Sequence, residues 1–289
     1  MAFKRQLRNY YILSKPGIIY ANILTALAGF LFASKFQGAP STLLGLIGGL
    51  TLVIAGACAY NNYLDRGIDS HMSRTKRRSL VTGDLSNKQA LVFATAVTLL
   101  GALLLLLTQN AVTVLLAAIA FVDYVVVYGW SKRKSVHGTL VGCVSGAIPL
   151  VAGYTAVTGS FDVTAGLLFA LMVAWQMVHF YGIALYRLED YMAAGIPVMP
   201  AVHGAKTTQY QSVAYIIMFL LISLLLVARG DVGAIAGGAL TVLAAVWLYR
   251  ALRSYSLVTA TVWGKQTFIF SLNVMLAMSV LLSVGRLVA

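Results

Sequence analysis

The chain has 289 residues, of which 60% are hydrophobic and only 10% are charged, and its mean hydropathy is +0.86. Because a soluble domain carries about 25% charged residues, this composition excludes soluble proteins and predicts an all-α, polytopic integral membrane protein. The net charge of +13 lies in short segments between apolar runs, so it indicates membrane topology rather than nucleic-acid binding.

Nine apolar runs follow one another along the chain, each long enough for a transmembrane helix. They cover residues 17–35, 42–64, 89–108, 111–129, 138–157, 163–186, 210–228, 232–250 and 267–287. Their connections are short, which predicts a single transmembrane domain over residues 1–289. The two cysteines, Cys58 and Cys143, lie in or beside these runs and are expected to be buried free thiols.

Lysine and arginine are distributed unequally between the two ends of these runs. Eighteen of them fall in the N-terminal segment and in the loops after even-numbered helices, and only Lys35, Arg229 and Arg286 fall on the other side. The positive-inside rule therefore predicts a cytoplasmic N-terminus and an external C-terminus. No signal-cleavage pattern follows the first run and no transit peptide precedes it, so a multi-pass protein of the bacterial inner membrane is expected.

Three polar residues end the second run at intervals of four: Asn61, Asp65 and Asp69. On a helix they share one face, where two carboxylates repel each other unless a cation lies between them. Mg²⁺ binds one or two carboxylates and bridges to substrate phosphates. The spacing predicts a Mg²⁺–diphosphate site at the cytoplasmic end of this helix. The alternative is a solvated helix end with paired charges.

A second polar segment ends the sixth run on the same side. Tyr186 and Asp190 repeat the spacing of four, and His179 lies two turns earlier on nearly the same face. Asp190 is expected to hold a second metal ion and Tyr186 to contact a diphosphate oxygen. His179 lies in an apolar stretch, where a polar side chain indicates function. The alternative is a core histidine bonded to a neighbouring helix.

Cations gather on the same side as both acidic sites. They are Arg66, Arg74, Lys76, Arg77, Arg78, Lys132, Arg133 and Arg187. A departing diphosphate needs positive partners, and arginine suits bidentate phosphate contacts, although topology alone explains any single member. Asp123 stands apart inside the fourth run, where an unpaired carboxylate costs roughly 2.5–3.5 kcal/mol. The sequence assigns it no role, and the two options are that it faces the cavity or bonds a nearby tyrosine.

In these residues the chain resembles the intramembrane, UbiA-type prenyltransferase superfamily, whose members share two Asp-rich motifs on a nine-helix bundle. Within it, the chain is most similar to the protoheme IX farnesyltransferases, or heme O synthases, over almost its whole length. The matching segments are Lys15-Pro16-Gly17, Asn61-x-x-x-Asp65-Arg66-x-x-Asp69, Arg74-Thr75-Lys76, Lys132-Arg133, Gly138-Thr139-Leu140-x-Gly142-x-x-Ser145-Gly146-Ala147-x-Pro149, Trp175-Gln176-Met177-x-His179, Tyr186-Arg187-x-x-Asp190-Tyr191 and Ile196-Pro197-Val198-Met199-Pro200. Val178 and Leu150 stand where the family usually has proline, and Tyr186 replaces the first Asp of the second motif, as is common in the heme branch.

The resemblance implies transfer of the farnesyl group of farnesyl diphosphate to the 2-vinyl group of heme b, with addition of water, giving heme O and diphosphate. It implies Mg²⁺ as cofactor, held by Asp65, Asp69 and Asp190, with Asn61 and Tyr186 completing the catalytic set. The implied diphosphate-binding residues are Arg66, Lys76, Lys132, Arg133 and Arg187, and the implied heme contacts are His179 and Trp175. Membrane lipid, heme A synthase and a terminal oxidase are the partners expected of such an enzyme.

Two other functions stay open. An aromatic prenyltransferase acting on a quinone precursor would share the metal site, and the His179 element argues against it. A small-molecule transporter or proton channel would use Asp123 and His179 as relay groups. Transporters place ionisable residues near the midplane and often contain an internal repeat, whereas the acids here cluster at one membrane face.

Overall fold

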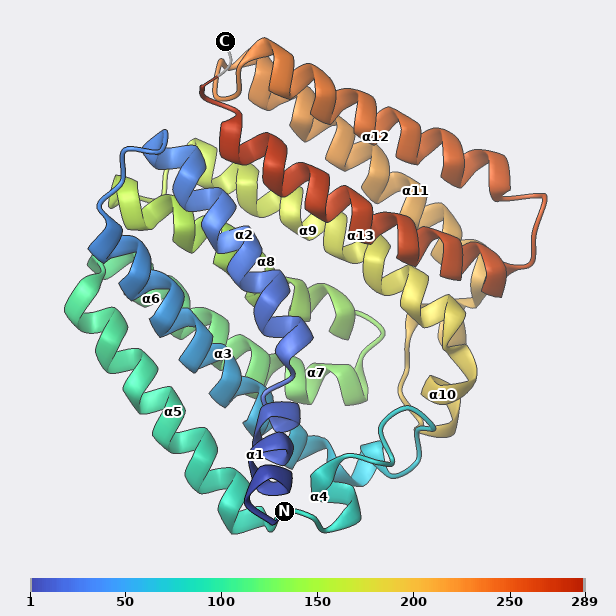
Figure 1. Cartoon of the computed structure of the whole chain (residues 1–289). Helices are drawn as coiled ribbons and strands as arrows, with labels where there is room; N and C mark the ends of the chain where they lie inside the picture. Colours follow the sequence, from blue (N-terminus) through green and yellow to red (C-terminus); the bar gives the residue numbers. More distant parts are fainter. Residues whose placement is uncertain (1, 288–289) are drawn as a thin grey trace.

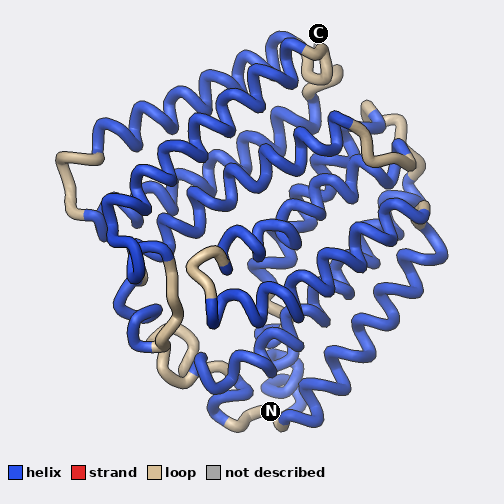
Figure 2. Tube along the Cα trace, turned by 180° about the vertical axis from the view of Figure 1, so that it is seen from behind, coloured by secondary structure: helices blue, strands red, loops and turns tan. Residues whose placement is uncertain are grey.

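The computed structural model describes residues 2–287, and all regular structure within that range is helical (Figures 1 and 2). Nine spans in this range are long and apolar enough to cross a membrane. They are α2 (Pro16–Ser34), α3 (Pro40–Asp69), α5 (Asn87–Thr108), the continuous span Ala111–Lys134, α8 (Gly138–Thr158), α9 (Val163–Tyr186), α11 (Met199–Ala228), α12 (Ala234–Ser254) and α13 (Ala260–Val284). The predicted fold class and all nine predicted runs are confirmed.

Several helical segments lie outside the predicted runs. They are α1 (Ala2–Leu13), α4 (Ser79–Thr82) and α10 (Leu188–Ala193). The fourth span is also not uniform, because a π-helical turn (Asp123–Val127) joins α6 (Ala111–Val122) to α7 (Tyr128–Lys134). Such turns are often found at functional sites. Here the turn lies directly before the basic end of the span.

The start of α11 differs most from the sequence prediction. The helix begins at Met199 rather than at residue 210, with Pro200 in its first turn, where a missing N–H costs nothing. Gly204 interrupts it with φ 82° and ψ 166°, a conformation that favours glycine. The segment around this break contains polar residues and no long apolar run, so hydropathy detects only the later part of the helix.

The helices form two groups joined by a central pair. α3 packs on α5, α9 packs on α11 and α13, and α2 and α8 lie against each other between the two groups (Figure 1). α2 and α8 approach closely because a Cβ on Gly29 would meet the carbonyl oxygen of Leu150, and a Cβ on Gly153 would meet that of Ala26. Small residues at helix crossings are typical of membrane proteins. This crossing connects the groups whose facing surfaces line the central cavity.

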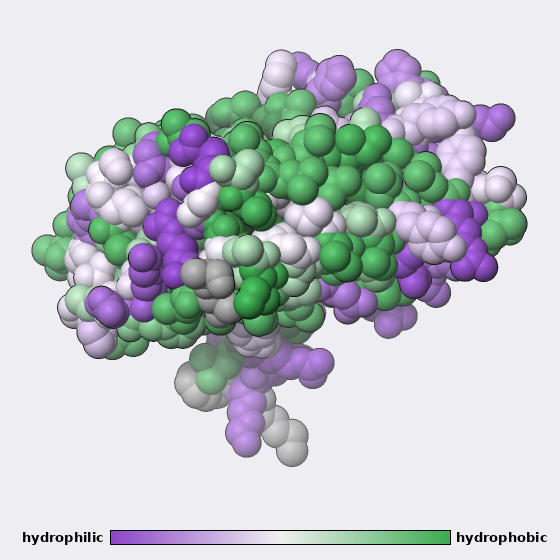
Figure 3. Space-filling model, turned by 90° about the horizontal axis from the view of Figure 1, so that it is seen from above, coloured by the Kyte–Doolittle hydropathy of each residue, from purple (hydrophilic) through white to green (hydrophobic). Residues whose placement is uncertain are grey.

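The outer surface is apolar around its middle. In Figure 3 hydrophobic side chains cover the centre of the visible face and hydrophilic ones gather toward its two ends. On α5, Leu99, Leu103 and Leu107 are all exposed, which would be unfavourable in water but suits lipid. The protein is therefore a multi-pass membrane protein.

Candidate active site

A cavity of about 800 Å³ lies among α2, α3, α8, α9 and α13, with α7 beside it. Its wall includes charged residues such as Asp65, Asp69 and Lys132 and also apolar ones such as Met172 and Phe268. A ligand pocket of this size suits a molecule larger than a simple metabolite. A single cavity therefore offers a polar, ion-binding surface and an apolar one.

The three polar residues of α3 all face this cavity. The helix continues to Asp69, so Asn61, Asp65 and Asp69 keep their helical spacing, and all three are buried. Burial excludes the solvated helix end that was the alternative for this motif. The charges are nevertheless paired. The distance from Asp69 Oδ2 to Arg78 Nη1 is 2.6 Å.

Asp65 is paired with cations from α7. Its Oδ2 accepts a hydrogen bond from Lys132 Nζ, and its Oδ1 lies 3.1 Å from Arg133 Nη2. Lys132 also lies over the ring of Tyr128, with 4.9 Å from Nζ to the ring centroid, and both residues line the cavity. Lys132 and Arg133 were predicted diphosphate contacts, and both lie beside the acidic motif, but only Lys132 lines the cavity.

Lys15 supplies another cation to this part of the cavity. Its Nζ donates to Asn61 Oδ1 over 2.7 Å, and the residue has a left-handed backbone with φ 52° where α1 gives way to α2. Burial lowers the pKa of Lys15 to about 8. In the sequence Lys15 was part of a matching segment without an assigned role. The structure makes it a cavity residue.

His179 lies on the wall formed by α9 and α13. The ring of Trp175 stacks on it with centroids 4.9 Å apart, and Trp175 Nε1 donates to the backbone carbonyl of Ser271 over 2.7 Å. The Ser271 hydroxyl donates to the carbonyl of Phe268 over 2.6 Å, so it accepts from His179 Nδ1, 2.8 Å away. This network puts the ring proton on Nδ1 and leaves the Nε2 lone pair free. His179 is hydrogen-bonded to a neighbouring helix, as expected of a core histidine. It also lines the cavity, as expected of a functional one.

Asp190 does not join the other two carboxylates. Its Oδ1 accepts from the hydroxyl of Ser73 at 2.6 Å and from the backbone N–H of Ser73 at 3.2 Å. The hydrogen bond from the Ser73 hydroxyl is the main cause that lowers the pKa of the Asp190 carboxyl. Asp190 does not line the cavity. Within residues 2–287 no three His, Cys, Asp or Glu side chains lie close enough to hold a metal ion alone.

The remaining predicted residues separate into two groups. Tyr186 and Arg187 line the cavity, with the Arg187 guanidinium 4.4 Å from the Tyr186 ring centroid. Arg66 is exposed and donates to the carbonyl of Tyr63 over 2.6 Å, and Lys76 is also exposed. Neither of these two lines the cavity. The structure therefore supports Arg187 more directly than Arg66 or Lys76 as a phosphate contact.

The donors in the cavity fit a hard divalent cation. Asp65 and Asp69 offer carboxylate oxygens and Asn61 an amide oxygen from one helix face, which is the donor chemistry of Mg²⁺. Asn61 Nδ2 is buried without a hydrogen-bond partner, so this amide is not fully satisfied in the present arrangement. Because two carboxylates fill few coordination positions, the rest would come from water or from a phosphate-bearing substrate.

Comparison with known proteins identifies the family. A model of the UbiA prenyltransferase family matches residues 22–274. The chain belongs to the UbiA prenyltransferase family. It is also 43% identical over 282 residues to the protoheme IX farnesyltransferase of Yersinia pseudotuberculosis serotype O:1b (strain IP 31758), covering 96% of this chain and 95% of that protein. The resemblance expected from the sequence motifs is confirmed.

Solved structures of the UbiA family share the fold. The structure of a digeranylgeranylglyceryl phosphate synthase aligns with a TM-score of 0.79 at 18% identity, over 98% of this chain and 99% of that one. A UbiA homolog from Archaeoglobus fulgidus bound to GPP and Mg²⁺ aligns with a TM-score of 0.74 at 14% identity, over 95% and 99% of the two chains. At these identities the likeness establishes the common architecture.

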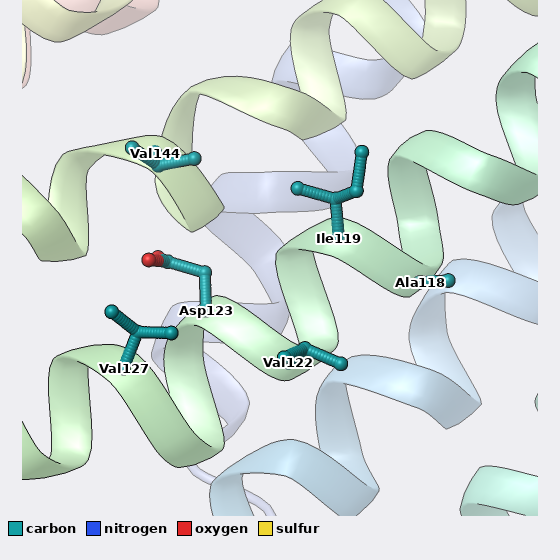
Figure 4. A pocket seen from close by; sticks show the side chains of 6 residues that line it. All are labelled: Ala118, Ile119, Val122, Asp123, Val127 and Val144. Carbon is teal, nitrogen blue, oxygen red and sulfur yellow. The ribbon is translucent and has the colours of Figure 1, made fainter.

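Asp123 lies away from the central cavity. Its Oδ2 accepts from the backbone N–H of Ser145 on α8 over 3.1 Å rather than from a tyrosine. The residue borders a separate groove of about 380 Å³ whose other lining residues are apolar (Figure 4). Ser145 itself lines the central cavity. Asp123 thus supports part of the cavity wall of this UbiA-family protein from outside.

Several cavity residues went unrecognised in the sequence. Tyr124 and Tyr128 line the cavity together with Lys132, and their only sequence signal is a shared spacing of four. Arg78 belonged to the basic group but was not singled out, since nothing in the sequence shows that it reaches Asp69. Gln176 lay within a matching segment, and its position on the wall emerges only from the packing of α9 against α8.

Proposed function

We propose that this chain transfers the farnesyl group of farnesyl diphosphate to the 2-vinyl group of heme b, with addition of water, releasing heme O and diphosphate. The observation that carries the proposal is a single cavity lined both by the Asp65–Lys132 pair and by His179 with an available Nε2. The first surface suits a diphosphate, and the second suits the iron of a porphyrin. Family membership and the name of its relatives agree with this assignment.

At the polar end, the residues of the chain would bind and hold the diphosphate. Lys132, Arg133 and Arg187 would contact its oxygens, and Asp65, Asp69 and Asn61 would bind Mg²⁺, with Asp190 the candidate for a second ion. When bound, Mg²⁺ supplies positive charge against the phosphate oxygens. Lys15 and Arg78 also line this surface and add to the positive field around the leaving group.

The proposed reaction breaks the bond between farnesyl C1 and the diphosphate oxygen, whose electron pair leaves with the diphosphate. The vinyl π-electrons of heme attack the resulting allylic cation and form the new C–C bond. Met172, Leu272 and Met275 give the wall an apolar surface for the prenyl chain and the porphyrin. Exclusion of bulk water there would prevent early hydrolysis of the allylic cation.

His179 would contact heme through Nε2. The Ser271 hydroxyl fixes the ring by accepting from Nδ1, and Trp175 packs against its face, so the free nitrogen is pre-oriented. We expect His179→Ala to weaken heme binding and to leave farnesyl diphosphate binding intact, as measured by heme titration and by binding of a non-reactive prenyl diphosphate. Equal losses of both affinities would contradict this role.

The test is a reaction of purified protein with heme b, farnesyl diphosphate and Mg²⁺, followed by mass spectrometry. The expected product is a farnesyl-plus-water adduct of heme, lost in Asp65→Asn and in the presence of EDTA. Diphosphate release with a phenolic acceptor but no heme adduct would move the substrate to a quinone precursor. No release with either acceptor would favour a transporter.

The position of the enzyme in the cell is part of the proposal. The distribution of lysine and arginine favours a cytoplasmic N-terminus and active site and an external C-terminus, and the relatives are bacterial, so the membrane would be the inner membrane. Heme A synthase or a terminal oxidase would then receive the product.

A further inference from the structure

The side chain of Gln176 is held in one orientation. It lies on α9, is buried and lines the central cavity. Its Nε2 lies 3.2 Å from the carbonyl oxygen of Cys143 on α8 and 3.3 Å from that of Met172 one turn earlier. Because a carbonyl only accepts hydrogen bonds, the nitrogen must face these two oxygens. The position of the amide oxygen is therefore fixed as well.

The Oε1 atom of Gln176 is left as a free acceptor. No residue in the range 2–287 donates a hydrogen bond to it, yet it is not among the fully buried unpaired atoms, so it remains reachable from the cavity. It lies against Gly146 of α8, where a Cβ would collide with it. Glycine at position 146 thus leaves the space that the amide oxygen occupies.

The surrounding wall is mostly apolar. Pro149, Met172 and Trp175 line the cavity near this position, and His179 lies one helical turn further along α9 on a neighbouring face. Ser145, which precedes Gly146, also lines the cavity, and its hydroxyl donates to the carbonyl of Gly142 over 2.9 Å. The free Oε1 of Gln176 is therefore a hydrogen-bond acceptor within a mostly apolar part of the wall, and it suits a ligand with O–H groups.

We propose that Gln176 positions the water molecule that adds to the porphyrin side chain. This inference rests on the proposed heme farnesyltransferase function. A water that donates a hydrogen bond to Gln176 Oε1 keeps its lone pairs free for attack. An amide suits this role because, unlike a carboxylate, it is neutral and does not combine readily with a carbocation.

The chemical balance of the step is complete. Attack of the vinyl π-electrons on farnesyl C1 leaves a cation on the vinyl carbon next to the porphyrin ring. The water oxygen forms a bond to that carbon, and the proton it loses passes to the released diphosphate, which is a base. If no water is held there, the cation instead loses a proton from carbon, and the product is a farnesyl adduct that lacks one water.

The test measures how the product divides between these two outcomes. Full-length Gln176→Met is incubated with heme b, farnesyl diphosphate and Mg²⁺, and the hydrated and anhydrous adducts are separated by their mass. We expect the ratio of hydrated to anhydrous adduct to fall about tenfold, the effect of losing one hydrogen bond to a reacting water. A lower total turnover with an unchanged ratio would mean a purely structural amide and would overturn the inference.

Two further variants keep the test decisive. In Gly146→Ala the new methyl group on α8 would push the amide oxygen of Gln176 aside while the glutamine itself is kept. This variant should shift the ratio in the same direction even if Gln176→Met is inactive. Gln209→Met changes a buried glutamine on α11 that does not line the cavity and should leave the ratio unchanged. An unchanged ratio in Gly146→Ala overturns the inference. Absence of any heme adduct from the unmodified chain overturns the proposed function instead.

Discussion

Lys15 illustrates how one residue contributes to the charge of the cavity. Its ammonium group contacts the neutral Asn61, and no carboxylate pairs with it in the part of the chain that the structure describes. Unlike Lys132 and Arg78, it does not have to leave an acidic partner before it can bind a phosphate oxygen. We therefore expect it to contribute directly to substrate binding.

Replacing Lys15 with Met should raise the KM for farnesyl diphosphate roughly 10- to 100-fold, because a charge-assisted hydrogen bond contributes about 1.5–3 kcal/mol. Steady-state kinetics at saturating heme measure the effect. Lys35→Met is the matched control, since Lys35 has nearly the same backbone conformation, with φ 51°, but caps the opposite end of α2 outside the cavity. Equal KM values for the two variants would show that Lys15 has only a structural role.

Substitution of Asp190 tests whether a second metal ion takes part in the reaction. If its carboxylate binds Mg²⁺, Asp190→Asn should raise the Mg²⁺ concentration for half-maximal rate about tenfold, as loss of a metal-supporting group usually does. The measurement is a Mg²⁺ titration of farnesyl transfer. Ser73→Ala removes the one hydrogen bond from the Ser73 hydroxyl but keeps the Asp190 carboxylate, so the Mg²⁺ requirement of this variant should change little. An unaltered Mg²⁺ dependence in Asp190→Asn would remove this residue from the metal site.

At the scale of helices, the sequence predicted which segments span the membrane but not where each helix begins and ends. Hydropathy identifies the long apolar runs because lipid requires them. It does not detect α1, whose basic and apolar residues lie on different faces of a helix that is not apolar overall, nor the early start of α11 before Gly204. The π-helical turn at Asp123 has no distinct sequence pattern either.

The same distinction holds for the candidate site. The spacing of Asn61, Asp65 and Asp69 predicted a shared helix face because that depends only on local geometry. The pairing of Asp65 with Lys132 joins residues on different helices, and the free oxygen of Gln176 depends on the carbonyl of Cys143 across a helix contact. Contacts between distant segments of the chain set these features, and residue spacing carries no information about them.

The crossing of α2 and α8 should be sensitive to a single methyl group. In Gly153→Ala the new Cβ would meet the Ala26 carbonyl and approach Phe30 N at 2.7 Å. Backbone atoms cannot move aside as side chains do, so we expect a loss of about 1–3 kcal/mol in stability. Thermal unfolding in detergent measures this loss. Gly238→Ala on α12, where a Cβ meets nothing within 4 Å, should unfold at the temperature of the unmodified chain.

For the whole molecule, the charge distribution predicts an orientation that labelling can test. Asn87→Cys and Gln37→Cys place exposed thiols at opposite ends of the bundle. The native Cys58 and Cys143 are buried and free, so they should give little background. In intact cells a membrane-impermeant maleimide should label Gln37→Cys and should label Asn87→Cys only after lysis. The reverse pattern would invert the proposed topology and move the active site to the outer face.

The ion pairs on α3 also have a thermodynamic consequence for the enzyme as a whole. A metal ion that binds Asp65 and Asp69 alone displaces Lys132 and Arg78 and leaves them unpaired, and a diphosphate that captures these cations alone leaves the two carboxylates unpaired. Bound together, each ligand stabilises the groups that the other releases. At the proposed site the two would therefore bind with positive cooperativity, and by reciprocity each would increase the affinity of the other equally. We therefore expect the cavity to respond to the metal–diphosphate complex as one ligand and to bind either component alone only weakly.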